Sequence, residues 1–175
     1  MPAQASTFGG NARGYFFTAP CDFTMTGLFV PGNNGTVQNI AVVRFDNNIP
    51  PPVYATTTNA FTTLYLTQNN IATGVIPVSI PVMAGDVIGV LATRGPGDVN
   101  SYAPSPSTTT INGYTVTIAR MGMQYPLATT APLELWQEVG GNISRLEITY
   151  ETGCESARTP TIATVTAPQI GRAHV

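Results

Sequence analysis

Turn-forming residues recur at short intervals along the whole chain, and this spacing limits what the chain can fold into. Seventeen glycines and fifteen prolines punctuate its 175 residues, and no long stretch between them has helical periodicity. The apolar runs between the turns are short. In one of them, residues 23–30, alternate positions share a face with a period of two: Phe23, Met25, Gly27 and Phe29. The pattern predicts an all-β protein.

The remaining segments follow the same pattern. Strands are expected at residues 15–18, 37–45, 61–66, 75–80, 87–91 and 143–151, and a hairpin is expected at residues 110–116. Asn34-Gly35 and Asn112-Gly113 predict tight turns, since both pairs readily adopt positive φ. Residues 94–107 are rich in Gly, Pro and Ser and predict a long loop. About eight to ten short strands at this spacing indicate an antiparallel β-sandwich, of jelly-roll or Ig-like type.

Charge is scarce, and this excludes some partners. Charged residues make up 9% of the chain, against about 25% in typical proteins. There is no lysine, and all seven basic residues are arginines. A net charge of −2 without a basic cluster argues against nucleic acid. The absence of an 18-residue apolar run predicts no membrane-spanning segment. A Thr- and Asn-rich surface is common in secreted β-proteins, so we expect a secreted or cell-surface location.

The chain divides into four expected parts. Residues 1–12 are interpreted as a leader or a signal-peptide remnant, because Ala3-Gln4-Ala5 has the small-x-small form of a cleavage site. Residues 13–152 form the β-sandwich. Residues 153–169 are its last strand or a linker to a further domain. Residues 170–175 read as the translation of a common sequencing-library adapter, ATC GGA AGA GCA CAC GTC, although a natural tail could share that sequence.

The adapter interpretation removes the single histidine, His174. Without histidine, and without lysine, nucleophilic catalysis lacks its usual base. The two cysteines, Cys21 and Cys154, could form a disulfide that closes a long loop, which would contribute up to about 4 kcal/mol. Alternatively, Cys154 pairs with a residue beyond the fragment. Two cysteines without histidine make a poor zinc site.

Aromatic residues in or beside the loops are the candidate ligand-binding residues. Sandwich proteins contact sugars through exposed rings accompanied by amide side chains, so the candidates are Tyr102, Tyr125, Trp136 and Asn100, with Tyr54 nearby. Trp136 has a second interpretation, as a plug at one end of the core, because a lone tryptophan buries a large area.

Acidic residues offer two weaker hypotheses. Glu134 and Glu138 flank Trp136 and could act as the paired carboxylates of a glycosidase. Asp46 and Asp98 lie in Asn-containing turns and are weak candidates for Ca²⁺, although Asp also favours turns for local reasons. No other cofactor is expected.

Several segments resemble one known group of proteins. Thr-Phe-Gly-Gly-Asn at 7–11, Gly-Tyr-Phe-Phe at 14–17, Ala-Gly-Asp at 84–86 and Ser-Arg-Leu-Glu-Ile-Thr-Tyr at 144–150 are similar to β-sandwich modules of large secreted proteins of Bacteroidota. Residues 153–160 resemble the closing strand of the Ig-like repeats that follow such modules. The resemblance spans about residues 7–167 and implies an exported, multidomain, cell-surface context without catalytic residues.

Three functional hypotheses follow. The first is a non-enzymatic extracellular module that is structural or adhesive and contacts glycans or other surface proteins. The second is a carbohydrate-active enzyme fragment that uses Glu134 and Glu138. The third is a self-associating subunit of an extracellular fibre or surface layer, favoured by the low charge and by exposed sheet edges.

Overall fold

The computed structural model describes residues 2–32 and 37–153, and it confirms an all-β, antiparallel, sandwich-like fold. The elements in chain order are β1 (Ser6–Phe8), β2 (Arg13–Thr18), β3 (Phe23–Phe29), β4 (Gln38–Phe45), the 3-10 turn η1 (Asp46–Asn48), β5 (Phe61–Asn70), β6 (Ile76–Val82), β7 (Val87–Arg94), β8 (Asn100–Pro104), β9 (Ser107–Ile111), β10 (Tyr114–Gly122), β11 (Trp136–Gln137), β12 (Asn142–Ser144) and β13 (Glu147–Glu151). Within these ranges, no helix has the length and apolar character needed to cross a membrane.

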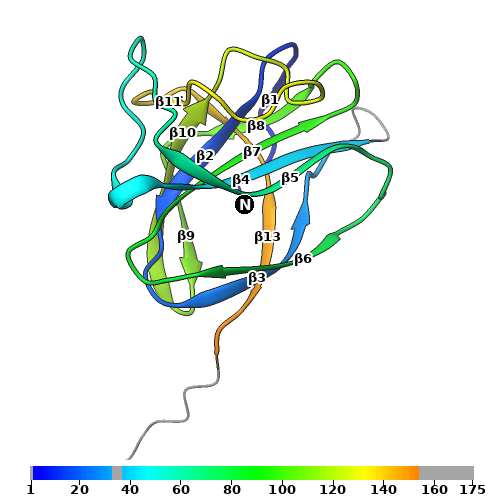
Figure 1. The fold of residues 1–175 in the computed structure, drawn as a ribbon. Helices are drawn as coiled ribbons and strands as arrows, with labels where there is room; N and C mark the ends of the chain where they lie inside the picture. Colours follow the sequence, from blue (N-terminus) through cyan, green and yellow to red (C-terminus); the bar gives the residue numbers. More distant parts are fainter. Residues whose placement is uncertain (1, 33–36, 154–175) are drawn as a thin grey trace, which may run out of the picture.

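The strands form one large sheet and two small ones (Figure 1). The large sheet has the order β11-β10-β2-β7-β4-β5, with β9 paired to the first half of β10. One small sheet has the order β13-β3-β6, and the other has the order β1-β8-β12. In Figure 1, β3 and β6 run along the bottom of the view, below β4, β5 and β7 of the large sheet.

The hydrophobic core lies on both faces of the large sheet. On one face, side chains of β2, β4, β7 and β10 pack against β3, β6 and β13 and against Ala103 and Ile143 of the other small sheet. On the opposite face, a second cluster includes Met123, Leu127 and Leu135, which follow β10. All eight residues of β7 are buried. A strand covered on both faces has no polar side to alternate with, which explains its continuous apolar run.

Two segments differ from the sequence-based expectation. Residues 94–107 do not form one long loop, because they contain β8, which pairs with β1 and β12. Residues 143–151 do not form one strand, because β12 pairs with β8 whereas β13 pairs with β3. Between them, the backbone N–H of Arg145 donates to the carbonyl oxygen of Ser101 and the buried Leu146 enters the core. A short crossing between sheets therefore divides what sequence periodicity predicts as a single strand.

Other expectations concern the ends and the turns. Residues 6–8, assigned to the leader by sequence, form β1, so this part of the leader belongs to the fold. The turn at Asn112-Gly113 is confirmed by positive φ at both residues (49° and 82°) and by the β9–β10 pairing around it. Asn34-Gly35, Cys154 and residues 154–175 lie outside the described residues, and with them the proposed disulfide, linker and adapter. Cys21 is partly buried beside the core.

Tyr15 connects the large sheet to the crossing segment. Its ring is buried, and its hydroxyl donates to the carbonyl oxygen of Leu146 at 2.7 Å. Burial raises the pKa of Tyr15 above its ordinary value, and the nearby Glu147 carboxylate raises it further. The phenol therefore remains protonated in the folded protein at alkaline pH.

We expect this tyrosine to make folding sensitive to alkaline pH. In the unfolded chain Tyr15 ionises near pH 10, whereas in the folded protein it resists ionisation, so its contribution to stability is complete below about pH 10 and falls above it. The expected slope is about 1.4 kcal/mol per pH unit. Tyr15→Phe should lose about 1 kcal/mol at neutral pH through the missing hydrogen bond and should lack this slope. Urea unfolding between about pH 8 and about pH 11 measures both.

The matched control is Tyr114→Phe. Tyr114 is 55% exposed on β10, so this variant should retain the alkaline slope of the natural chain. Equal slopes for Tyr15→Phe and the natural chain would contradict the assignment.

Candidate functional site

Three of the four ligand-binding candidates from the sequence lie beside Arg13, at the start of β2, or beside its neighbour Ala12, and the fourth lies beside Arg120 of β10. Asn100 accepts a hydrogen bond from the Arg13 backbone N–H through Oδ1 (2.9 Å). The carbonyl oxygen of Tyr125 accepts from the neighbouring Ala12 N–H (2.9 Å). The Arg13 guanidinium lies 4.8 Å from the centroid of Trp136. Tyr102 joins the group through a second arginine, Arg120, whose guanidinium lies 5.8 Å from its ring centroid.

The two arginines and the aromatic rings around them form what we call the arginine–aromatic cluster. It occupies the end of the sandwich where β2, β10 and β11 of the large sheet approach β1 and β8. Its members are Phe8, Arg13, Tyr54, Tyr102, Arg120 and Trp136.

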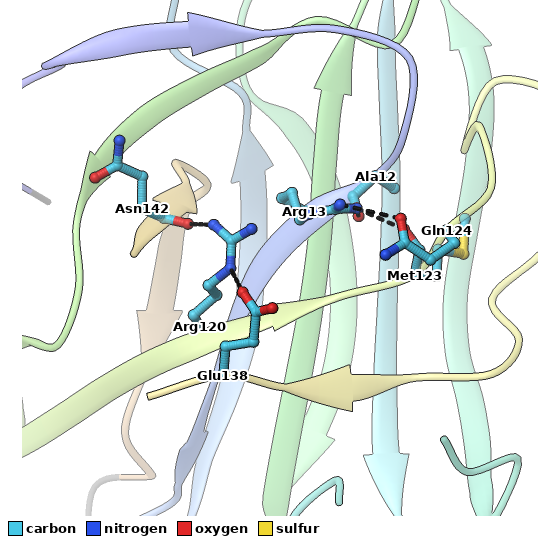
Figure 2. A network of polar contacts seen from close by, with 7 residues as sticks. All are labelled: Ala12, Arg13, Arg120, Met123, Gln124, Glu138 and Asn142. Atoms are coloured by element: carbon cyan, nitrogen blue, oxygen red, sulfur yellow. Dashed lines mark hydrogen bonds and ion pairs between the residues drawn. The ribbon is translucent and has the colours of Figure 1, made fainter. Parts of the chain in front are cut away.

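Arg13 is a buried cation that is hydrogen-bonded to carbonyl groups. It is 6% exposed. Its Nη1 donates to the carbonyl oxygens of Ala12 (3.0 Å) and Met123 (2.6 Å), and its Nη2 donates to Oε1 of Gln124 (3.2 Å); Figure 2 shows these residues together. Burial lowers the pKa of Arg13, although a guanidinium remains charged at neutral pH. The carbonyl dipoles and the ring of Trp136 therefore replace the water that would otherwise solvate this charge.

Gly122 makes room for the contact between Arg13 and Trp136. In the sheet, Gly122 of β10 lies opposite Arg13 on one side and opposite Trp136 on the other. A Cβ atom at position 122 would lie 2.7 Å from Cδ of Arg13 and 2.9 Å from Cζ2 of Trp136. The arginine side chain therefore reaches the indole across a strand position that has no side chain.

Arg120 connects the cluster to the surface. Its guanidinium lies 5.7 Å from the centroid of Trp136, so Trp136 contacts both arginines. Its Nε donates to Oε2 of Glu138 at 2.8 Å, and its Nη1 donates to the carbonyl oxygen of Asn142 (Figure 2). The Glu138 side chain is 41% exposed, whereas that of Arg120 is 12% exposed. Of the two partners in this ion pair, the Glu138 carboxylate is therefore the one that solvent or a ligand can reach.

Two partly exposed rings border the buried part of the cluster. Phe8 of β1 stacks on Tyr102 with a centroid separation of 5.6 Å and an angle of 3° between the ring planes. Tyr54 meets Trp136 edge to face at 5.2 Å. Phe8 is 36% exposed and Tyr54 is 48% exposed. The backbone N–H of Tyr54 also donates to the carbonyl oxygen of Gln137, so the loop that carries this ring is attached to β11.

The predicted ligand residues themselves are mostly interior. Trp136 is 1% exposed and Tyr102 is 8% exposed, so the core-plug interpretation of Trp136 is the one that the structure supports. Asn100 is fully buried, and its Nδ2 donates to the carbonyl oxygens of Phe8, Asn11 and Asp98. These side chains hold backbone and rings in place. Tyr102 and Asn100 were expected in an exposed loop, because β8 is not apparent in the sequence.

The two Ca²⁺ candidates, Asp46 and Asp98, differ in their exposure to solvent. Asp46 is exposed at the start of η1. Asp98 is fully buried; its carboxylate accepts from Oγ1 of Thr93 (2.6 Å) and from the backbone N–H of Ala128 (3.0 and 3.2 Å). Asp98 therefore fastens the segment after β10 to the β7–β8 turn. Among the residues that the structure describes, no three His, Cys, Asp or Glu side chains gather as a metal site.

The two glutamates of the glycosidase hypothesis have different partners. Glu134 is exposed, and its Oε2 accepts from the Tyr125 hydroxyl at 2.8 Å. This hydrogen bond, followed by the carboxylate's charge, raises the pKa of Tyr125. Glu138 is paired with Arg120, as described above. Neither glutamate lines the cavity that lies between β2, β10 and β13.

Comparison with known proteins does not assign this chain to a family. No family model matches the chain, and neither a curated protein nor a solved structure is significantly similar to it.

Gly122→Ala tests the packing of the cluster. The added methyl group must displace Arg13 or Trp136, so we expect the free energy of unfolding to fall by about 1–3 kcal/mol. Trp136 is the only tryptophan in the chain, so its fluorescence emission reports the displacement directly. The control is Gly74→Ala, because no atom lies within 4 Å of a Cβ built there. Its stability should change by less than about 0.5 kcal/mol. Unchanged stability and emission in Gly122→Ala would contradict the packing described here.

Proposed function

We propose that this chain is a non-catalytic binding module of a secreted or cell-surface protein, and that it contacts carbohydrate through the exposed rim of the arginine–aromatic cluster. The rim consists of Phe8, Tyr54 and Glu138. The observation that carries the proposal is the combination of two partly exposed rings with a partly exposed, arginine-paired carboxylate at one end of the sandwich.

The chemistry of the rim suits a sugar. A pyranose presents C–H groups on its faces and hydroxyl groups around its edge, so it pairs an aromatic surface with hydrogen-bond acceptors and donors. Phe8 and Tyr54 supply the aromatic surface, and the Glu138 carboxylate supplies an acceptor.

The rim is also preorganised. Phe8 is stacked on Tyr102, Tyr54 is packed on Trp136, and both underlying rings contact Arg120. Because a ligand would not have to order these rings, little of the binding free energy would be lost on binding. Such a surface binds without needing a reactive group, which fits a structural or adhesive role.

The extracellular context rests on the sequence. A 9% content of charged residues, a surface rich in Thr and Asn, and the resemblance to modules of secreted Bacteroidota proteins all support export. Glycans and other surface proteins are the partners that this context would supply.

A glycan array of polysaccharides and oligosaccharides tests the proposal. We expect the natural chain to bind a subset of glycans, and Tyr54→Ala and Phe8→Ala each to weaken that binding about tenfold, equivalent to about 1.4 kcal/mol. Tyr114→Ala removes an exposed tyrosine at the opposite end of β10 from Arg120 and should bind like the natural chain.

Three outcomes would contradict the proposal. The first is the absence of binding to any glycan, and the second is an equal loss of binding in Tyr114→Ala. The third is hydrolysis of a bound polysaccharide that Glu138→Gln abolishes, because that result would make the module an enzyme.

A further inference from the structure

A second site lies inside the sandwich, in a cavity of about 190 Å³ that opens to solvent. It is distinct from the arginine–aromatic cluster, although both use the same face of β2. Arg13 belongs to the cluster, and Tyr15 and Phe17, further along the strand, line the cavity. Other lining residues are Phe23, Ile118, Leu146 and Tyr150.

The sheet topology explains why this space is left open. β2 and β10 pair from Arg13↔Gly122 to Phe16↔Ala119, and the rest of β10 pairs with β9. Side chains from beyond that point, including Phe17, Val116 and Ile118, line the cavity. β9 and β13 belong to different sheets, and residues of both strands contribute to the lining. The cavity therefore lies where the two layers of the sandwich separate.

The cavity has an apolar floor and a polar rim. Rings and branched side chains make up most of the lining, and Thr109, Thr110, Glu147 and Tyr150 add polar groups. The Tyr150 hydroxyl accepts a hydrogen bond from the backbone N–H of Asn112 at 3.0 Å. A phenol has one proton to donate as well as its lone pairs, so Tyr150 can donate to a ligand while it accepts from Asn112. The Tyr15 hydroxyl, in contrast, already donates to Leu146.

The volume and the lining limit the ligand. An apolar cavity of about 150 Å³ is large enough for benzene, so this one accepts a single six-membered ring with a small substituent. The hydroxyl groups at the rim favour a ligand that carries an oxygen. The Glu147 carboxylate, whose side chain is 48% exposed, disfavours an anionic ligand at the rim.

We propose that this cavity is a binding site for an uncharged, single-ring phenol or aromatic alcohol. The ring occupies the space between Phe17, Phe23 and Ile118, and the hydroxyl group of the ligand accepts a hydrogen bond from Tyr150. This proposal does not depend on carbohydrate binding at the cluster, so either one can fail alone.

The experiment is a titration of the full chain with p-cresol, followed by ¹H–¹⁵N correlation spectra and by calorimetry. We expect saturable shifts at residues of β2, β9, β10 and β13 that line the cavity. The anionic analogue 4-methylbenzoate should bind at least about tenfold more weakly, because Glu147 carries the same charge. Absence of saturable shifts from p-cresol up to its solubility limit would overturn the proposal, as would equal binding of both compounds.

Two variants locate the site. Val116→Phe places a ring in the cavity and should abolish p-cresol binding while the fold is retained; unchanged affinity in this variant would overturn the proposal.

Tyr150→Phe keeps the cavity and removes the hydrogen-bond donor, so it should weaken p-cresol binding about fivefold or more and leave toluene binding unchanged. If Val116→Phe does not fold, Tyr150→Phe still decides: equal p-cresol affinity in this variant and the natural chain would overturn the role of the hydroxyl group. Tyr114→Phe is the matched control and should bind p-cresol like the natural chain.

Discussion

The contact between the buried Arg13 guanidinium and the ring of Trp136 is the interaction on which this end of the sandwich depends. Burying a cation is costly unless carbonyl groups, rings or counter-charges replace its water. Here two backbone carbonyls, one amide oxygen and an indole ring surround the charge. The Ala12 carbonyl adjoins Arg13 in the chain, whereas Met123 and Gln124 follow β10 and Trp136 belongs to β11. Satisfying one guanidinium therefore fixes the positions of β10, β11 and the segment after β10.

The arrangement also carries a cost that limits substitution. Arg13 Nε and Trp136 Nε1 are buried, and neither has a hydrogen-bond partner in the described part of the chain. A buried donor without a partner costs about 1–3 kcal/mol, so the cation–π contacts and the packing must offset two such donors. If the cluster were packed more loosely, the cation–π contacts would weaken while the two buried donors would still lack hydrogen-bond partners. This balance explains why Gly122, which leaves room for close contact, matters as much as the charged residue.

Several arginines of this protein connect separate segments through contacts with aromatic rings and backbone carbonyl groups. Arg13, Arg94 and Arg120 lie over aromatic rings, at Trp136, Phe29 and Tyr102 among others. Arg145 donates through Nε to the carbonyl oxygen of Pro2, and Arg94 donates to that of Val30. A planar guanidinium with several donors can stack and hydrogen-bond at once, which the compact ammonium of lysine does less well. The use of arginine in the interior is consistent with a chain that contains arginine and no lysine.

Local signals in the sequence predicted much of the fold, and long-range pairing determined the rest. Asn112-Gly113 predicted its hairpin because the turn chemistry is local, and the apolar run in residues 87–91 predicted a strand. β8 was missed because it is short, begins with the polar Asn100 and Ser101 and lies in a segment rich in Gly and Pro, and because its pairing partners lie in β1 and β12.

The candidate site was predicted in part. The sequence singled out Tyr102 and Trp136, and the structure brings both against Arg120. The expected exposure of Tyr102 is wrong, whereas the burial of Trp136 agrees with its interpretation as a core plug. Arg13 and Gly122 gave no signal in the sequence. One is an ordinary arginine at a strand start and the other an ordinary glycine at a strand end, and only the register across β2, β10 and β11 relates them to Trp136.

A double-mutant cycle between Arg13 and Trp136 tests the central claim most directly. Arg13→Met keeps a long side chain without the charge, and Trp136→Leu keeps an apolar side chain without the indole ring. We predict from urea unfolding that the two substitutions are coupled by about 1–2 kcal/mol, as expected for a desolvated cation–π contact. A coupling energy near zero would mean that the arginine and the ring stabilise the sandwich independently, and it would contradict this account.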